Sequence, residues 1–211
     1  MNGKCVYAIL TDHGFGHASR TAQILSVIKQ KLPGIRIIVN SSTPFWFFKV
    51  FLGDSPEIRS FPMDAGIVQS DALKVDISAT KRKLEAIYSD RAKIVSAEAE
   101  FIRKNRVQLV IGDIPALAVD AAHAAGVNCA LIGNFGWDFI YRGVSGLEDF
   151  ARLFLDSYAR CDFLFRLPFH EPMESFGTKM DTGVTGLPPG DLDLLKNTYF
   201  SIDRVRKSRR I

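Results

Sequence analysis

Cysteine, tryptophan and histidine are all scarce in this sequence. Its 211 residues include three cysteines, two tryptophans and four histidines. The cysteines, Cys5, Cys129 and Cys161, are odd in number, far apart and set among apolar residues. This pattern excludes a disulfide framework and a cysteine-based zinc site, and it predicts buried thiols in a reducing compartment.

Long apolar runs are missing as well. The stretch ALAVDAAHAAGVNCALIG is interrupted by Asp120, His123 and Gly126, and it falls short of the roughly 18 uninterrupted apolar residues of a membrane span. The first apolar run is only about seven residues long and lacks the basic segment and cleavage site of a signal peptide. We therefore expect a cytoplasmic protein with no membrane span.

The body of the chain also lacks an excess of charge. The formal net charge is +4, but five of the 27 basic residues lie among the last eight positions, which leaves 22 basic and 23 acidic side chains in residues 1–203. Without a face of interleaved aromatic and basic residues, specific nucleic-acid binding is not expected. We interpret residues 191–211 as a basic C-terminal tail or the truncated start of a second lobe.

Short β-rich runs alternate regularly with segments of helical period. Strands are expected at 6–10, 35–39, 58–61, 107–111, 127–132 and 163–167, and helices at 19–32, 44–53, 84–102, 116–125 and 147–158. Such alternation is typical of parallel βαβ units. Residues 1–190 are therefore predicted to form one α/β domain, doubly wound around a mainly parallel sheet of about six or more strands.

Two glycines and two histidines follow the first expected strand in DHGFGHASR, residues 12–20. Ligands of open α/β sheets bind beyond the carboxyl ends of the strands, where glycines allow close approach and helix N–H groups attract anions. The dinucleotide fingerprint fits poorly, because Ser19 stands where a third glycine or alanine belongs and Asn40 where an acid belongs. The P-loop pattern is absent from this stretch.

His13 and His17 have the spacing of two metal ligands on a helix, but the intervening glycines argue against a helix, so no metal site is expected. The histidines could also merely cap the following helix. A third interpretation makes the loop part of a ligand site, together with two other strand ends.

The fourth expected strand is followed by GDIP, residues 112–115, which contains Asp113, and the fifth is followed by NFGWD, residues 134–138. A carboxylate beside His17 would make this histidine a better general base, although Asp113 could equally cap the alanine-rich helix. Phe135 and Trp137 could form the aromatic wall of a site for a sugar or another ring-bearing ligand, or they could belong to the core.

Five separate stretches carry a resemblance to a known family: HGFGHASR, DAGIVQSDALKVD, GDIPALAVDAAHAAGV, NFGWDFIY and CDFLFRLPFHEPM. Together they look like the Rossmann-like N-terminal lobe of GT-B glycosyltransferase-like proteins. They resemble above all the glycosyltransferase-like region of L-arabinokinase-type proteins and its stand-alone bacterial relatives. More remotely, the glycine-histidine loop is similar to that of peptidoglycan N-acetylglucosaminyltransferases and UDP-glycosyltransferases.

The resemblance implies a two-lobed enzyme that moves a sugar from a nucleotide-sugar, its co-substrate, to an acceptor hydroxyl. The N-terminal lobe, here residues 1–190, binds the sugar-containing acceptor, and the other lobe binds the donor. The resemblance also implies catalytic roles for His17 as base and Asp113 as its support, 96 positions apart. No further cofactor is implied. The residues expected to bind substrate are His13, Gly14, Phe15, Gly16, Asn134, Phe135, Trp137 and Asp138.

The sequence departs from the family in one respect, because after DTGVTGLPPGDLDLLKNTYF it contains neither the second lobe nor a kinase-type ATP site. We therefore expect the chain to be inactive alone and to require a partner chain that supplies the second lobe, or to form a homo-oligomer. The alternative is a non-catalytic module that binds carbohydrate or nucleotide-sugar.

Overall fold

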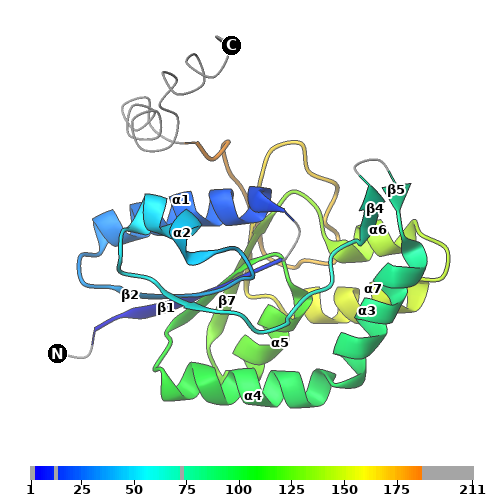
Figure 1. Cartoon of the computed structure of the whole chain (residues 1–211), viewed down its shortest axis with the longest axis horizontal. Helices are drawn as coiled ribbons and strands as arrows, with labels where there is room; N and C mark the ends of the chain where they lie inside the picture. The colour runs from blue at the N-terminus through cyan, green and yellow to red at the C-terminus, as the bar shows by residue number, and fades with distance from the viewer. Residues whose placement is uncertain (1–2, 12–13, 72–73, 187–211) are drawn as a thin grey trace, which may run out of the picture.

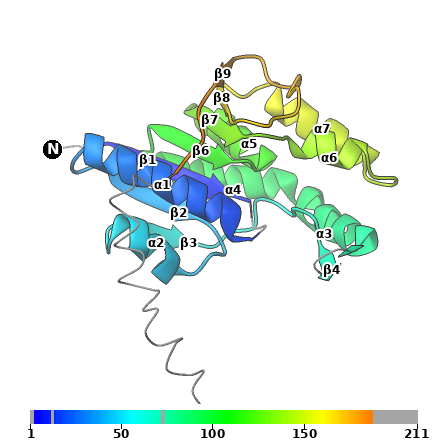
Figure 2. The same cartoon turned by 90° about the horizontal axis from the view of Figure 1, so that it is seen from above.

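The computed structural model describes residues 3–11, 14–71 and 74–186. Within them, seven parallel strands form one sheet (Figure 1), and their order is β3-β2-β1-β6-β7-β8-β9. Figure 2 shows the strands in this order, from β3 at one edge to β9 at the other. The strands are β1 (Cys5–Leu10), β2 (Arg36–Asn40), β3 (Glu57–Arg59), β6 (Leu109–Asp113), β7 (Asn128–Gly133), β8 (Phe163–Arg166) and β9 (Lys179–Asp181). The predicted doubly wound parallel sheet is confirmed.

Helices cover both faces of the sheet. In Figure 1, α1 (Phe15–Lys31) and α2 (Phe45–Leu52) lie above the sheet, whereas α4 (Arg91–Lys104) and α5 (Ala116–Ala125) lie below it. On the side of α5, α3 (Ile77–Ser89), α6 (Trp137–Arg142) and α7 (Glu148–Tyr158) complete the layer through their buried side chains. None of the helices in the described ranges has the length and apolar character needed to cross a membrane.

Strand β1 shows why the sheet is buried on both faces. All six of its side chains are buried. Because successive side chains of a strand point to opposite faces, Val6, Ala8 and Leu10 pack against α1 and α2, while Tyr7 and Ile9 pack on the opposite side. A strand that is buried on both faces is typical of the centre of a parallel sheet.

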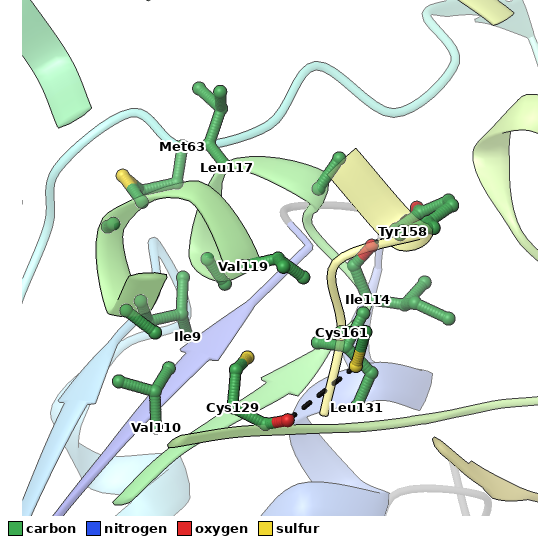
Figure 3. Close-up of a cluster of buried hydrophobic side chains, with 14 of the residues drawn as sticks. Ile9, Met63, Val110, Ile114, Leu117, Val119, Cys129, Leu131, Tyr158 and Cys161 are labelled. Carbon is green, nitrogen blue, oxygen red and sulfur yellow. Dashed lines mark hydrogen bonds between the residues drawn. The ribbon is translucent and has the colours of Figure 1, made fainter. Parts of the chain in front are cut away.

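The larger hydrophobic cluster lies on the side of α4, α5 and α7 (Figure 3). It contains all three cysteines, which are free and buried as the sequence predicts. The Cys161 thiol lies 3.6 Å from the Cys129 carbonyl oxygen, which it can reach as a weak donor. These thiols are therefore part of the core.

The smaller cluster, on the side of α1 and α2, leaves part of the sheet uncovered by the described chain. A cavity of about 380 Å³ opens there between α1 and strands β6, β7 and β8. Its walls are almost entirely apolar and include Ile24, Ile28, Ile111, Ile132 and Phe165. The two faces of the sheet are thus covered unequally.

Several predicted elements differ from the structure. The single helix expected at 84–102 is two helices, α3 and α4, which meet at Asp90. Helix α1 starts at Phe15, four residues before the expected start, because Gly14 adopts a φ of 69° and already serves as its N-cap. Strand β9 and the small antiparallel pair β4 (Gln69–Asp71) and β5 (Lys74–Val75) were not predicted. The proposed tail at 191–211 lies outside the described residues.

Candidate active site

The candidate site lies where the carboxyl ends of β1, β6 and β7 meet. These three strands are adjacent and parallel, with Leu10 paired to Asp113 and Gly112 paired to Leu131. The loop after β1, the residues after β6 and the residues after β7 consequently share one edge of the sheet. The sequence predicted this gathering from the fold class alone.

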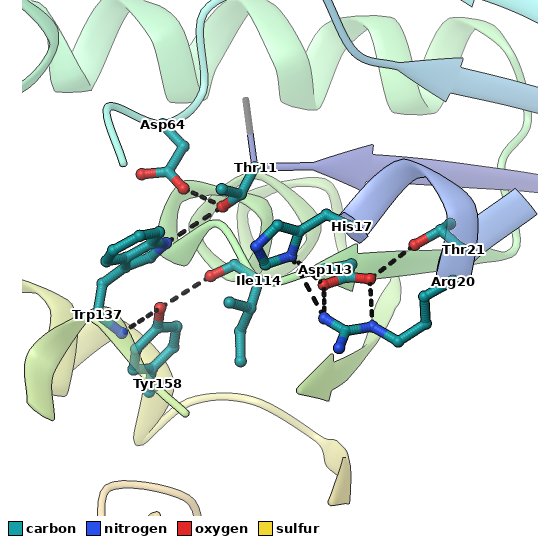
Figure 4. Close-up of polar contacts among 9 residues, drawn as sticks. All are labelled: Thr11, His17, Arg20, Thr21, Asp64, Asp113, Ile114, Trp137 and Tyr158. Atoms are coloured by element: carbon teal, nitrogen blue, oxygen red, sulfur yellow. Dashed lines mark hydrogen bonds and ion pairs between the residues drawn. The ribbon is translucent and has the colours of Figure 1, made fainter. Parts of the chain in front are cut away.

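His17 and Asp113 form a buried pair at this edge (Figure 4). His17 lies in the first turn of α1 and is 8% exposed, and Asp113 ends β6 and is 0% exposed. The distance from His17 Nδ1 to Asp113 Oδ1 is 2.7 Å. The sequence therefore identified two side chains that the fold brings into direct contact, although they are 96 positions apart.

The charge of Asp113 determines which nitrogen of His17 carries the proton. Burial acts to raise the pKa of Asp113, but hydrogen bonds and positive charge from its neighbours outweigh burial and lower this pKa below its ordinary value. An ionised carboxylate can only accept hydrogen bonds, so Nδ1 of a neutral His17 must be the donor. Nε2 then carries the lone pair and is the nitrogen that can take up a proton.

Two further residues of α1 bind the same carboxylate. Arg20 donates from Nε to Asp113 Oδ2 at 2.8 Å and from its Nη2 to Oδ1, and the Thr21 hydroxyl donates to Oδ2 at 2.9 Å. His17, Arg20 and Thr21 are spaced i, i+3, i+4, which places them on one face of the helix. Asp113 is therefore held by three side chains of a single helical turn.

Asp113 does not cap the alanine-rich helix, which was the alternative interpretation. Helix α5 has Pro115 as its N-cap and receives no side-chain cap hydrogen bond. Arg20 and Thr21 were not singled out from the sequence. The available signal was their spacing from His17 within HASRT, which is i+3 and i+4. This spacing places the three side chains on one helical face only if the helix begins before His17.

A second polar group lies beside the pair and joins Thr11, which directly follows β1, to the segment after β3 and to α6 (Figure 4). Trp137 Nε1 donates to Thr11 Oγ1 at 3.2 Å, and the Thr11 hydroxyl donates in turn to the carboxylate of Asp64. All three residues are buried. Burial raises the pKa of Asp64. Hydrogen bonds from Thr11, Ala65 and Gly66, together with the charge of His17, lower this pKa by a smaller amount, so it lies above its ordinary value.

The predicted aromatic pair divides between the core and the neighbourhood of His17. Trp137 is 2% exposed and stacks on Tyr141, with 5.5 Å between ring centroids, so in this structure it belongs to the core. Phe135 is partly buried, and its ring lies edge-on to the His17 ring at 6.2 Å. Among the predicted pair, Phe135 is therefore the ring that lies against the candidate base.

The remaining residues expected to bind substrate lie in different surroundings. Gly14 and Gly16 have open space where a side chain would begin, and Phe15 is 53% exposed with its ring 5.2 Å from that of Phe47. These features suit the close approach of a ligand. That Gly14, Phe15 and Gly16 bind substrate stays a prediction. His13 lies outside the described residues.

Asn134 and Asp138 flank the aromatic pair. Asn134 is partly buried and its carbonyl accepts from the backbone N–H of Glu171 at 3.0 Å. Asp138 is buried at the start of α6, and burial raises the pKa of its carboxyl group. Within the described ranges, no three side chains of His, Cys, Asp or Glu gather in a way that could hold a metal ion.

This architecture is a glycosyltransferase-like Rossmann fold of the GT-B type, as the comparisons with known proteins confirm. Arabidopsis thaliana UGT89C1 superposes with a TM-score of 0.55 at 13% identity, over 93% of this chain and 55% of that chain. Phytolacca americana UGT2, whose structure contains UDP-2fluoro-glucose and pterostilbene, superposes with a TM-score of 0.54 at 12% identity, over 94% and 58% of the two chains. At these identities the likeness shows the fold.

In sequence, the chain is similar to the L-arabinokinase of Arabidopsis thaliana, with 30% identity over 178 residues. The match covers 82% of this chain and 17% of the plant protein, so the chain spans a small part of that relative. No family model matches the sequence. The predicted resemblance to the N-terminal half of GT-B proteins and to the L-arabinokinase type is confirmed.

Proposed function

We propose that this chain is the acceptor-binding lobe of a glycosyltransferase, with His17 as its general base. One observation carries the proposal: a histidine whose Nδ1 is 2.7 Å from a buried carboxylate lies at the carboxyl ends of the strands of a GT-B-type sheet. Open α/β sheets bind their ligands at this edge. This arrangement fixes the ring and leaves Nε2 available. A general base requires a nitrogen of that kind within reach of the hydroxyl that it deprotonates.

In the proposed reaction an acceptor hydroxyl attacks the anomeric carbon of a nucleotide-sugar. The new bond joins the acceptor oxygen to the sugar, the bond between the sugar and the nucleotide breaks, and the hydroxyl proton moves to Nε2 of His17. The negative charge of Asp113 stabilises the imidazolium that forms. We assign the sugar-containing acceptor to this lobe and the nucleotide-sugar to a second lobe, which the same or another polypeptide supplies.

The proposal predicts separate effects on rate and on binding. With the chain joined to a nucleotide-sugar-binding lobe, His17→Ala should lower turnover by roughly 10² to 10⁴ and leave the donor dissociation constant nearly unchanged, since proton transfer belongs to the transition state. Asp113→Asn should lower turnover less. Transfer rate and donor binding are measured side by side, with His123→Ala as control because His123 is an exposed residue of α5.

Full turnover in His17→Ala would contradict the proposed mechanism. An equal loss of donor binding and rate would instead make the glycine-histidine loop a ligand cradle without a role in proton transfer. A joined protein that binds carbohydrate or nucleotide-sugar but transfers no sugar would support the alternative, a non-catalytic binding module.

A further inference from the structure

Arg20 contacts both members of the buried pair. Its guanidinium group donates to both oxygens of Asp113, and its Nη2 also lies 3.3 Å from His17 Nδ1. Asp113 Oδ1 is shared between His17 and Arg20. The site therefore consists of a carboxylate with a fixed positive charge on one side and a titratable imidazole on the other.

The balance of these charges determines the protonation state of His17. A lone carboxylate beside a histidine favours the imidazolium form, which has no lone pair left to accept a proton. A guanidinium group remains charged at any pH at which proteins are folded, so it offsets the carboxylate permanently. Arg20 is therefore placed to oppose the protonation that Asp113 alone would favour.

Two further side chains of the described residues face His17 from other elements. Phe135, which follows β7, presents an uncharged ring edge, and Asp64 interacts with His17 electrostatically from the segment after β3. Because burial raises the pKa of Asp64, its negative charge is disfavoured. Among the residues that the structure describes, Arg20 and Asp113 are the charged groups in direct contact with His17.

We propose that Arg20 is a positioning residue that orients Asp113 through its two-pronged contact and, by offsetting the carboxylate charge, keeps His17 neutral in the resting site. The catalytic meaning of this inference rests on the proposed function. The relation between the three side chains does not, and it can be measured on the chain as it exists without any transfer assay.

The experiment follows the imidazole signals of the four histidines by nitrogen NMR while the pH is varied. It compares the wild type with Arg20→Gln, Asp113→Asn, the double variant, and the control Arg91→Gln. Arg91 is a matched control because its Nε and Nη2 also donate to a buried carboxylate, that of Asp120, at 2.9 and 2.7 Å.

In Arg20→Gln, the midpoint of the His17 titration should rise by about one pH unit or more, because the carboxylate charge is no longer offset. In the double variant it should return toward the wild-type midpoint, since both charges are gone. Arg91→Gln should leave it unchanged. In the wild type at neutral pH, the spectrum should show the proton on Nδ1.

Circular dichroism of each variant checks that it folds. If Arg20→Gln fails to fold, the double variant is compared with Asp113→Asn alone. The only difference between these two proteins is Arg20, and its removal should again raise the midpoint of the His17 titration. An unchanged midpoint in the folded variants, or an equal rise in Arg91→Gln, would overturn the role of Arg20. Normal turnover in His17→Ala would contradict the proposed function and leave this measurement unaffected.

Discussion

At the scale of single residues, Asp64 links the site to the pH dependence of folding. Its raised pKa, caused mainly by burial, means that the folded chain holds the Asp64 proton more tightly than the unfolded chain does. The stabilising contribution of that proton is fully present when the pH is below the pKa of Asp64 in the unfolded chain. It is lost as the pH rises through the pKa of Asp64 in the folded chain. Asp64 therefore acts against stability at neutral pH.

Replacement of this group should remove its part of the pH dependence. The free energy of unfolding of the wild type, minus that of Asp64→Asn, should decrease as the pH rises from about 4 toward neutrality. Urea unfolding at several pH values measures the difference. Asp149→Asn is the control, because the Asp149 side chain is 93% exposed. A constant or rising difference for Asp64→Asn would contradict the prediction.

The sequence could predict some of the site residues and not others, for a physical reason. His17 and Asp113 each follow an expected strand, so the fold class alone places them on one edge. Arg20 and Thr21 share a face with His17 only if all three are helical, and the expected helix began at Ser19. Asp64 lies in an irregular segment after the short strand β3, where no periodicity indicates which way a side chain points.

At the scale of elements, the division between α3 and α4 is hidden by the apolar pattern. Leu84, Ile87, Ile94 and Ile102 are all buried in one cluster and keep an almost helical spacing across the boundary at Asp90. Such a pattern is compatible with one long helix. Strand β9 was missed for the opposite reason, because all three of its side chains are exposed and only its backbone pairing with β8 defines it.

The start of α3 offers a test of local stability. Asp76 is its N-cap, and Asp76 Oδ1 accepts a hydrogen bond from the backbone N–H of Ala79 at 2.7 Å. Asp76→Ala should therefore lower the free energy of unfolding by about 1 kcal/mol. Asp90→Ala is the matched control at the start of α4, where no side-chain cap hydrogen bond is formed. Chemical denaturation of both variants measures the effect, and equal losses would show that capping is not its source.

At the scale of the whole molecule, the sheet separates two helical layers that pack against it unequally closely. Seven of the ten residues of α5 are buried, against five of the 17 residues of α1. The apolar cavity of about 380 Å³ lies between α1 and the sheet, so part of this helix does not pack directly on the strands. Alternation in the sequence predicted helices on both faces, but it contains no information on how closely each helix packs.

Helix α1 should consequently open more readily than the opposite layer. Local opening costs less free energy where few apolar contacts are lost, so the amide hydrogens of α1 should exchange with deuterium faster than those of α5. Mass spectrometry of the native chain measures both rates, and slower exchange in α1 would contradict the expectation. Because His17, Arg20 and Thr21 all belong to α1, each opening would separate them from Asp113 while the sheet stays intact. Mild denaturant should then abolish the histidine-carboxylate pair together with the helical circular dichroism signal of α1, before the rest of the fold unfolds.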